Sequence, residues 1–335
     1  MRLFIAPHRV LAAAALCALA AGCAGGAPTQ NATYVPLAGG AQVRPARALA
    51  FLTAPHAARR GGGWLSPEAK SGKHVIYVSD FTNNAVKIYS TQGTNQSPIG
   101  QITDGISGPE GCFVDKHGNL FVTNASNQTV TMYPKGSTTM KLQYTGFAYP
   151  TNVAVGANGV VYVVDLVGEK VVEFPKGSTR SSQTIDVTYP QGAALDKKNN
   201  LYVEYNTGAH GAGPATVDEY APKSTSGQNL NLPIVWGAGD AIDGSSDVVT
   251  ADQGSGSNAA VYVFPPGSTQ ASKTINQGME DPFRLAFDKP FKHLYVADPE
   301  VNAVLVYDYP SGTLVNKITN SLGMADGVAV SPEKS

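Results

Sequence analysis

The stretches Tyr133-Pro134-Lys135-Gly136-Ser137-Thr138 and Phe174-Pro175-Lys176-Gly177-Ser178-Thr179 are two copies of one short element that decides the fold of this 335-residue chain. Related copies begin at Tyr89, Tyr220, Phe264 and Tyr309. Successive aromatic positions are 44, 41, 46, 44 and 45 residues apart. A period in the forties, filled with short β-patterned segments, is typical of a β-propeller with one blade per repeat.

Each repeat contains the same succession of predicted strands. The first strand begins with a Pro-x-Gly-like element, of which Pro109-Glu110-Gly111-Cys112-Phe113-Val114-Asp115 is the clearest copy. A tight turn such as His117-Gly118-Asn119 leads to the second strand, because its residues tolerate positive φ. The third strand ends at the aromatic residue, and a fourth, outer strand follows in most repeats. The sequence therefore predicts an all-β fold.

The two ends of the repeat array complete each other. No Pro-x-Gly strand precedes His74, whereas the C-terminal Ala325-Asp326-Gly327-Val328-Ala329-Val330-Ser331 is a first strand without the rest of its blade. We expect this strand to lie innermost in the blade that the N-terminal strands begin, because ring closure hides sheet edges. The prediction is a six-bladed propeller over residues 74–331.

The N-terminus has the pattern of an export signal over residues 1–22. Arg2 and Arg9 flank an apolar stretch that is too short to span a bilayer. Small residues before Cys23 resemble the bacterial lipoprotein signal, which implies a lipidated Cys23 and a place in the cell envelope, at the outer membrane or its periplasmic face. A plain secretory signal with an unmodified Cys23 is the alternative. Residues 23–73, rich in Ala, Gly and Pro, are predicted to form a flexible tether.

Composition narrows the classes of partner. The formal net charge is −1 and no face dense in Lys and Arg is predicted, which argues against nucleic acid. Besides Cys17 and Cys23 the chain has only Cys112, so the folded domain has no intrachain disulfide. Cys112 lies in an apolar strand and is interpreted as a small buried hydrophobe. We expect a monomer.

The repeat resembles that of the NHL-repeat propellers. The shared features are Pro-x-Gly followed by three apolar residues and Asp, a Gly-Asn turn, an aromatic-Val-x-Asp strand and an apolar strand ending in an aromatic residue. The resemblance covers about residues 75–330 and implies a binding or interaction scaffold. Propellers of this kind serve many functions, so the fold leaves the ligand open.

Candidate ligand-binding residues follow from the position between the Pro and the Gly of each first strand, at the mouth of the central channel. Two further polar residues replace the Gly in two repeats. The candidates are Glu110, Thr151, Asn152, Gln191, Phe283, Arg284 and Asp326.

Three of these candidates also resemble a metal set. In the gluconolactonase-like six-bladed propellers a Glu, Asn and Asp set at the channel holds a divalent metal, and the resemblance places Glu110, Asn152 and Asp326 in those roles. Such oxygen ligands suit Ca²⁺ or another divalent cation. The alternative is a structural role, with Arg284 neutralising a carboxylate.

A second polar row is predicted to be structural. Asp80, Asn124, Asp165, Asp252 and Asp298 end the second strands, and a residue repeated in nearly every blade is expected to cap a turn through hydrogen bonds to backbone groups. Tyr205 stands at this position in the fourth blade. Long Gly-rich segments follow the second strands of the fourth and fifth blades, and we expect both on one face, where binding loops accumulate.

Two functions remain open from sequence. The first is an envelope-anchored, non-catalytic module that binds a protein or a small molecule through its loop-bearing face. The second is a metal-dependent hydrolase or lyase of the gluconolactonase-like kind, in which a cation polarises a carbonyl or activates water. No nucleophile elbow, phosphate loop or His-based triad is present in the sequence.

Overall fold

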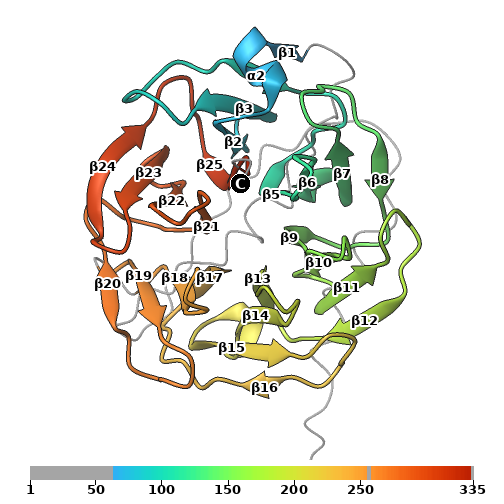
Figure 1. The fold of residues 1–335 in the computed structure, drawn as a ribbon. Coiled ribbons are helices and arrows are strands. Elements are labelled where there is room, and N and C mark those ends of the chain that lie inside the picture. The colour runs from blue at the N-terminus through green and yellow to red at the C-terminus, as the bar shows by residue number, and fades with distance from the viewer. Residues whose placement is uncertain (1–62, 255–257, 333–335) are drawn as a thin grey trace, which may run out of the picture. The chain divides into compact units, whose positions relative to one another are not determined.

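The computed structural model describes residues 63–254 and 258–332, all within the compact unit Ala41–Ser335. They form six antiparallel sheets arranged as blades around a central channel (Figure 1). The prediction of an all-β, six-bladed propeller is confirmed. Cys23 and the predicted signal lie outside the described residues.

Blades 2 to 6 are four-stranded meanders that run outward from the channel. Their strands are β5 (Pro109–Val114), β6 (Leu120–Asn124), β7 (Thr129–Tyr133) and β8 (Leu142–Tyr144) in blade 2; β9 (Pro150–Val155), β10 (Val161–Asp165), β11 (Lys170–Phe174) and β12 (Gln183–Asp186) in blade 3; β13 (Pro190–Leu195), β14 (Leu201–Asn206), β15 (Ala215–Tyr220) and β16 (Gln228–Asn229) in blade 4; β17 (Gly237–Ile242), β18 (Val248–Asp252), β19 (Ala260–Phe264) and β20 (Lys273–Ile275) in blade 5; and β21 (Arg284–Phe287), β22 (His293–Asp298), β23 (Ala303–Asp308) and β24 (Thr313–Ile318) in blade 6.

Blade 1 is assembled from both ends of the described chain. From the channel outward its strands are β25 (Ala325–Val330), β2 (Val75–Asp80), β3 (Ala85–Ser90), β4 (Gly100–Ile102) and β1 (Trp64–Leu65). Val78 pairs with Val328 across the closure. The C-terminal strand is therefore innermost, as predicted.

Two elements precede residue 74, where the sequence placed the start of the propeller. Strand β1 pairs with β4, and the helix α2 (Pro67–Ser71) follows it. Ser66 caps the helix by accepting a hydrogen bond from Ala69 N at 3.1 Å, and Gly72 ends it with φ 58°. Ala69 is buried in the core of blades 1 and 2, which explains why this short segment is ordered.

The repeated aromatic residue anchors each third strand between blades. Tyr89 and Tyr133 are fully buried, and their hydroxyls donate to the backbone carbonyls of Asn320 and Asp104. In the sixth copy, the aromatic residue at this structural position is not the one that the repeat alignment of the sequence selects. Tyr307, paired with Leu294, takes the structural position, and its hydroxyl donates to Gln277 O. Tyr309, which the sequence aligned with the repeat, lies two residues beyond it.

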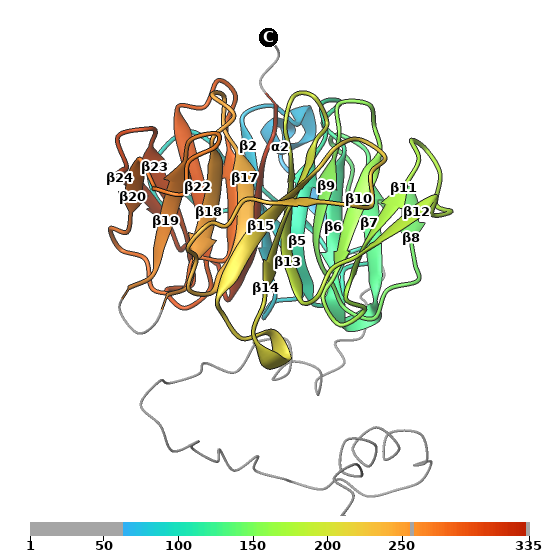
Figure 2. The ribbon, with the colours of Figure 1, turned by 90° about the horizontal axis from the view of Figure 1, so that it is seen from below.

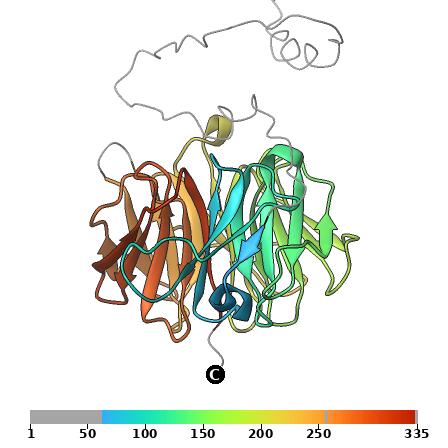
Figure 3. The same cartoon turned by 90° about the horizontal axis from the view of Figure 1, so that it is seen from above.

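The propeller has two faces that differ in their connections. On the loop face the inner strands begin and the second strands end, and the 3-10 helix η2 (Ala209–Gly211) projects from it (Figure 2). On the opposite, C-terminal face the inner strands end, and α2 lies on that side (Figure 3). The turns after the inner strands, such as the one containing Asp243 and Asp247, belong to the C-terminal face. None of the helices in the described ranges is long and apolar enough to cross a membrane.

Candidate functional site

All seven channel candidates are buried. The structure places them on the inner strands or directly before them, and the exposed fraction of each is 8% or less. They therefore lie inside the channel wall rather than on a solvated mouth. The residues are Glu110, Thr151, Asn152, Gln191, Phe283, Arg284 and Asp326.

Close packing of the inner strands explains this burial. A Cβ on Gly111 would lie 2.6 Å from the carbonyl oxygen of Thr151, and one on Gly327 would collide with the carbonyl of Glu110. The glycine of the Pro-x-Gly element thus lets neighbouring inner strands approach backbone to backbone. Blades 3 and 6 carry Asn152 and Arg284 at this position instead.

Arg284 occupies the middle of the channel. Its Nη1 donates to the carbonyls of Ala238 and Phe283, and its Nη2 donates to Thr151 O at 3.2 Å, on the blade opposite its own. Nη2 also lies 3.9 Å from Glu110 Oε2. The guanidinium therefore links blades 2, 3, 5 and 6, and its planar set of donors is suited to this role.

Glu110 has a second strong partner. The Tyr149 hydroxyl donates to Glu110 Oε1 at 2.6 Å, and both residues are buried. Burial and the charge of Glu110 raise the pKa of Tyr149 far above its ordinary value, so the phenol remains a proton donor. Glu110 is thus bound by a phenol and a guanidinium of the chain itself.

Sequence reasoning missed two further acids of the cluster, Glu204 on β14 and Asp240 on β17. Gly192 pairs with Glu204 in register, and a Cβ on Gly192 would lie 2.5 Å from Asp240 Oδ1, so the two carboxylates are neighbours at the junction of blades 4 and 5. The available signal was their position. Both stand at repeat positions where other blades carry small or apolar residues. Ser79, for example, holds in blade 1 the position that Glu204 holds in blade 4.

The acids at this junction favour their neutral forms. Burial raises the pKa of Asp240 from 3.8 to about 8. Burial and the nearby charges of Asp240 and Asp252 raise the pKa of Glu204 well above its ordinary value. The pKa of Arg284 is lowered by burial, while Glu110, Asp326, Glu204 and Asp240 act in the opposite direction. One buried guanidinium therefore faces four carboxyl groups.

One member of the metal set suggested by resemblance, Glu110, is held by these internal contacts. Of its three members, Glu110 pairs with Arg284, and a guanidinium so close to the carboxylates repels a cation. Within residues 63–254 and 258–332, no group of three or more His, Cys, Asp and Glu side chains is arranged to hold a metal ion. The cluster is best described as a buried polar core with its own cation.

The second polar row is structural, as predicted. Asp165 accepts hydrogen bonds from the backbone N–H groups of Ala148 and Tyr149, which lead into the inner strand of the same blade. Asp252 and Asp298 make equivalent bonds in blades 5 and 6. Asp80 bonds to Gly323 N and Asn124 to Ser107 N. In blade 4, Tyr205 stands at this position, paired with Pro190, and its hydroxyl donates to Asp218 Oδ1 instead.

Cys112 is not a reactive thiol. It is buried, and burial raises its pKa to about 12. A thiol that stays protonated is a poor nucleophile, so the sequence interpretation of a small core residue is confirmed.

The loop face carries apolar side chains beside the blade 4 loop, residues 207–214. A Cβ on Gly211 would lie 3.3 Å from the ring of Tyr189, and Gly213 packs against the backbone of Val235 and Trp236. Val235 is 50% exposed, and Tyr189 and Trp236 are half-buried. We call Tyr189, residues 207–214, Val235 and Trp236 the loop-face patch.

Comparisons with known proteins agree on the fold. No protein family matches the chain, and no curated protein matches it in sequence. Among solved structures, a chain in the crystal structure of a nidogen/laminin complex is 14% identical with a TM-score of 0.62, over 78% of this chain and 99% of that one. Hydrazine synthase of Kuenenia stuttgartiensis is 14% identical with a TM-score of 0.57, over 79% and 88%.

A third similar structure is a functionally unknown protein from Desulfotomaculum acetoxidans DSM 771. It is 13% identical with a TM-score of 0.56, over 78% of this chain and 100% of that one. At such identities the likeness shows the shared fold alone. A function must therefore be inferred from the residues of this chain itself.

Proposed function

We propose that this protein is an envelope-anchored, non-catalytic propeller of the NHL-like type that binds a partner protein through its loop face. The observation that carries the proposal is the loop-face patch. Val235 leaves half of its surface exposed next to a half-buried Trp236. Exposed apolar side chains beside aromatic ones are the features of a protein-binding surface.

The blade 4 loop supports this role because it is internally braced. Thr207 N donates to Pro214 O at 2.8 Å, and Gly208 N donates to Ala212 O at 2.8 Å. A loop held by its own hydrogen bonds loses little conformational entropy when a partner binds. The crystal structure of a nidogen/laminin complex contains a chain with a similar fold, which is compatible with such a use.

The test compares two valines whose side chains are exposed to a similar extent. Val235 in the patch is 50% exposed, and Val315 on the outer strand β24 is 47% exposed. We expect the immobilised wild-type protein and Val315→Glu to retain the same partner from native extracts. Val235→Glu should recover about tenfold less of it. Equal recovery with both variants would exclude the loop-face patch as the binding surface.

The anchoring part of the proposal rests on the pattern before Cys23. A lipidated Cys23 would hold the propeller at a membrane through the intervening segment. Metabolic labelling with a fatty-acid analogue should modify the wild-type protein and leave Cys23→Ala unlabelled and soluble. An exported wild-type protein without label would favour the plain secretory alternative.

The metal-dependent hydrolase remains the competing function and makes a different prediction. A cation bound only by the folded state must raise its stability, by about 2.7 kcal/mol at a hundredfold excess over Kd. The binding-module proposal expects the same melting temperature in EDTA and in Ca²⁺ or Zn²⁺. A metal-dependent rise that disappears in Asp326→Asn would support the hydrolase instead.

A further inference from the structure

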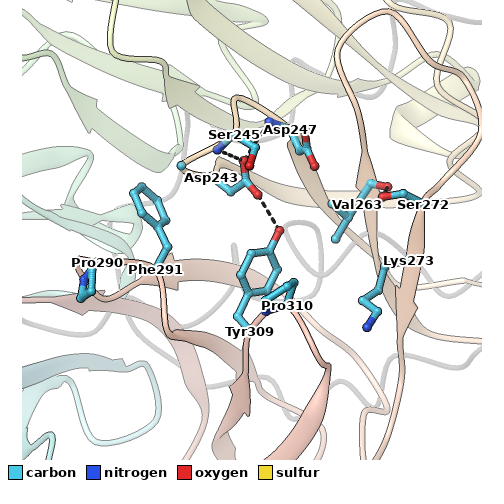
Figure 4. Close-up of a pocket in the computed structure, with 11 residues that line it drawn as sticks. Asp243, Ser245, Asp247, Val263, Ser272, Lys273, Pro290, Phe291, Tyr309 and Pro310 are labelled. Atoms are coloured by element: carbon cyan, nitrogen blue, oxygen red, sulfur yellow. Dashed lines mark hydrogen bonds between the residues drawn. The ribbon is translucent and has the colours of Figure 1, made fainter.

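A pocket of about 500 Å³ opens on the C-terminal face at the junction of blades 5 and 6 (Figure 4). Blade 5 contributes the turn after β17 with Asp243 and Asp247, together with Lys273. Blade 6 contributes Phe291 and Tyr309. The pocket is separate from the channel cluster, and it lies on the face opposite the loop-face patch.

The turn that forms one wall differs from its copies in other blades. In blade 2, Asp115 accepts two backbone N–H groups through Oδ1, and Asn119 Nδ2 donates to Asp115 Oδ2 at 2.8 Å. In blade 4, Asn200 Nδ2 donates to Asp196 Oδ2 at 3.1 Å in the same way. In these two blades an Asn thus satisfies and screens the Asp, and in blade 6 the ring of His293 contacts Asp288 Oδ2 at 2.6 Å instead.

Blade 5 keeps the Asp and replaces the Asn by a second acid. Asp243 Oδ1 still accepts from Ser245 N and Asp247 N, at 2.8 and 2.9 Å. Asp247 has no amide to donate, and Asp243 Oδ2 instead accepts the Tyr309 hydroxyl at 2.8 Å. The substitution therefore adds a negative charge where the fold requires none.

This charge has no cation of the chain to balance it. Among the described residues, no Lys, Arg or His nitrogen lies within 4.0 Å of either carboxylate. Lys273, which lines the pocket, donates instead to the carbonyl of Ser311 at 2.7 Å. Burial and the charge of Asp243 raise the pKa of Asp247, as expected for an acid without a counter-ion.

Aromatic rings form the other wall. Phe291 has a φ of 69°, unusual for a bulky residue, and a Cβ on Gly244 would lie 3.1 Å from its ring. Phe287 packs between Phe291 and Tyr309, with ring centroids 5.4 and 4.8 Å away. Lys289 Nζ lies 3.8 Å from the centroid of Phe291, so the ring already attracts one cation.

We propose that this pocket binds a protonated amine or guanidinium, with its charge against Asp247 and its hydrocarbon portion against Phe291 and Tyr309. The volume lies within the range of small-ligand pockets, roughly 300–1,000 Å³. A free alkylamine and a basic side chain of a peptide share this chemistry. The inference does not depend on the loop-face function, because it concerns other residues on the other face.

The test is a titration of the full chain with agmatine and, separately, with N-butylurea, a neutral analogue of similar length. Calorimetry or ligand-observed NMR measures the binding. We expect saturable agmatine binding, with Kd on the order of 1 mM, and at least about tenfold weaker binding of N-butylurea. No saturation by agmatine at about 10 mM, or equal binding of the two probes, would overturn the proposal.

The decisive variant is Asp247→Asn, which restores the residue found in the turns of blades 2 and 4. It should keep or raise the melting temperature, since Asn can donate to Asp243, and should weaken agmatine binding about tenfold. Asn200→Asp creates the same acid pair in blade 4 without this pocket and should leave agmatine binding unchanged. Undiminished binding by Asp247→Asn would refute the assignment.

A second variant tests the aromatic wall. Phe291→Asn tolerates the positive φ and removes the ring, so the fold should persist while agmatine affinity falls about threefold to tenfold; unchanged affinity would remove the ring from the proposed site.

N-acetyl-arginine methylamide, which represents a basic side chain in a peptide, separates the two sources. Tighter binding than agmatine indicates a peptide, and weaker binding indicates a free amine.

Discussion

Arg284 is the residue on which the interior of the propeller depends. It stands where four of the other five blades carry glycine, reaches across the channel to Thr151 O, and lies 3.9 Å from Glu110. A buried carboxylate that loses its cation becomes an uncompensated charge in a poorly solvated site. The side chain that pairs with Glu110 therefore also holds the inner strands together.

Removing this guanidinium should be strongly destabilising. We expect Arg284→Met to lower the free energy of unfolding by about 3–5 kcal/mol at neutral pH, because Glu110 and its neighbours stay buried without a counter-ion. Urea denaturation measures the loss, and Arg284→Lys, which keeps the charge, should lose less. If Arg284→Met unfolded at the wild-type urea concentration, the channel cluster would have no structural role.

Asp240 should make stability depend on pH. Its pKa is about 8 in the folded protein against an ordinary 3.8, so between these values the folded state keeps a proton that the unfolded chain has released. Stability must then fall as pH rises from about 4 to 8. Glu204 shifts in the same direction.

The variant Asp240→Asn removes this contribution. Relative to the wild type, it should gain stability progressively between pH 5 and pH 8, as measured by urea unfolding at several pH values. Asp186→Asn, at an exposed position on β12, is the matched control and should show no such trend. A constant difference between Asp240→Asn and the wild type across this range would contradict the assignment.

At the scale of the element, the blades repeat one device. In blades 1, 2, 3, 5 and 6 the carboxylate or amide that ends the second strand receives N–H groups from the segment leading into the inner strand, as Asp165 does for Ala148 and Tyr149. Blade 4 is the exception to this device. Tyr205 stands at the capping position and bonds to Asp218, while Asn206, one residue further on, accepts a hydrogen bond from Gly237 N at the start of the blade 5 inner strand.

Loss of one such residue should weaken its blade. We expect Asp165→Ala to cost about 2–3 kcal/mol of unfolding free energy, since buried N–H groups lose a charged acceptor. Asp165→Asn should cost less, because blade 2 uses the amide of Asn124 at this position. Hydrogen exchange of the Tyr149 amide provides a local measure, and unaltered protection in Asp165→Ala would argue against the capping role.

For the whole molecule, closure of the ring is the critical feature. Strand β25 covers the inner edge of β2, and Ser331 bonds to Val75 through both its backbone N–H and its hydroxyl. An open inner edge would leave unpaired backbone groups of β2 available to another chain.

Deletion of residues 321–335 should therefore abolish the cooperative unfolding transition and cause aggregation. Circular dichroism during heating and size-exclusion chromatography measure both effects. Removal of residues 333–335 alone, which leaves β25 intact, is the control and should behave as the wild type. A monomeric 321–335 deletion with an unchanged melting temperature would show that closure is dispensable.

The sequence alone determined the number of blades, the strand order within them and the closure by a C-terminal strand, because these follow from local patterns repeated along the chain. It also identified the capping row, since repetition itself marks a structural role. Tertiary structure decided which side chains meet. The contact of Arg284 with a blade opposite its own, the pairing of Glu204 with Asp240, and the shift of Tyr309 out of the repeat into a pocket all join residues from different blades, and their spacing in sequence carries no trace of those contacts.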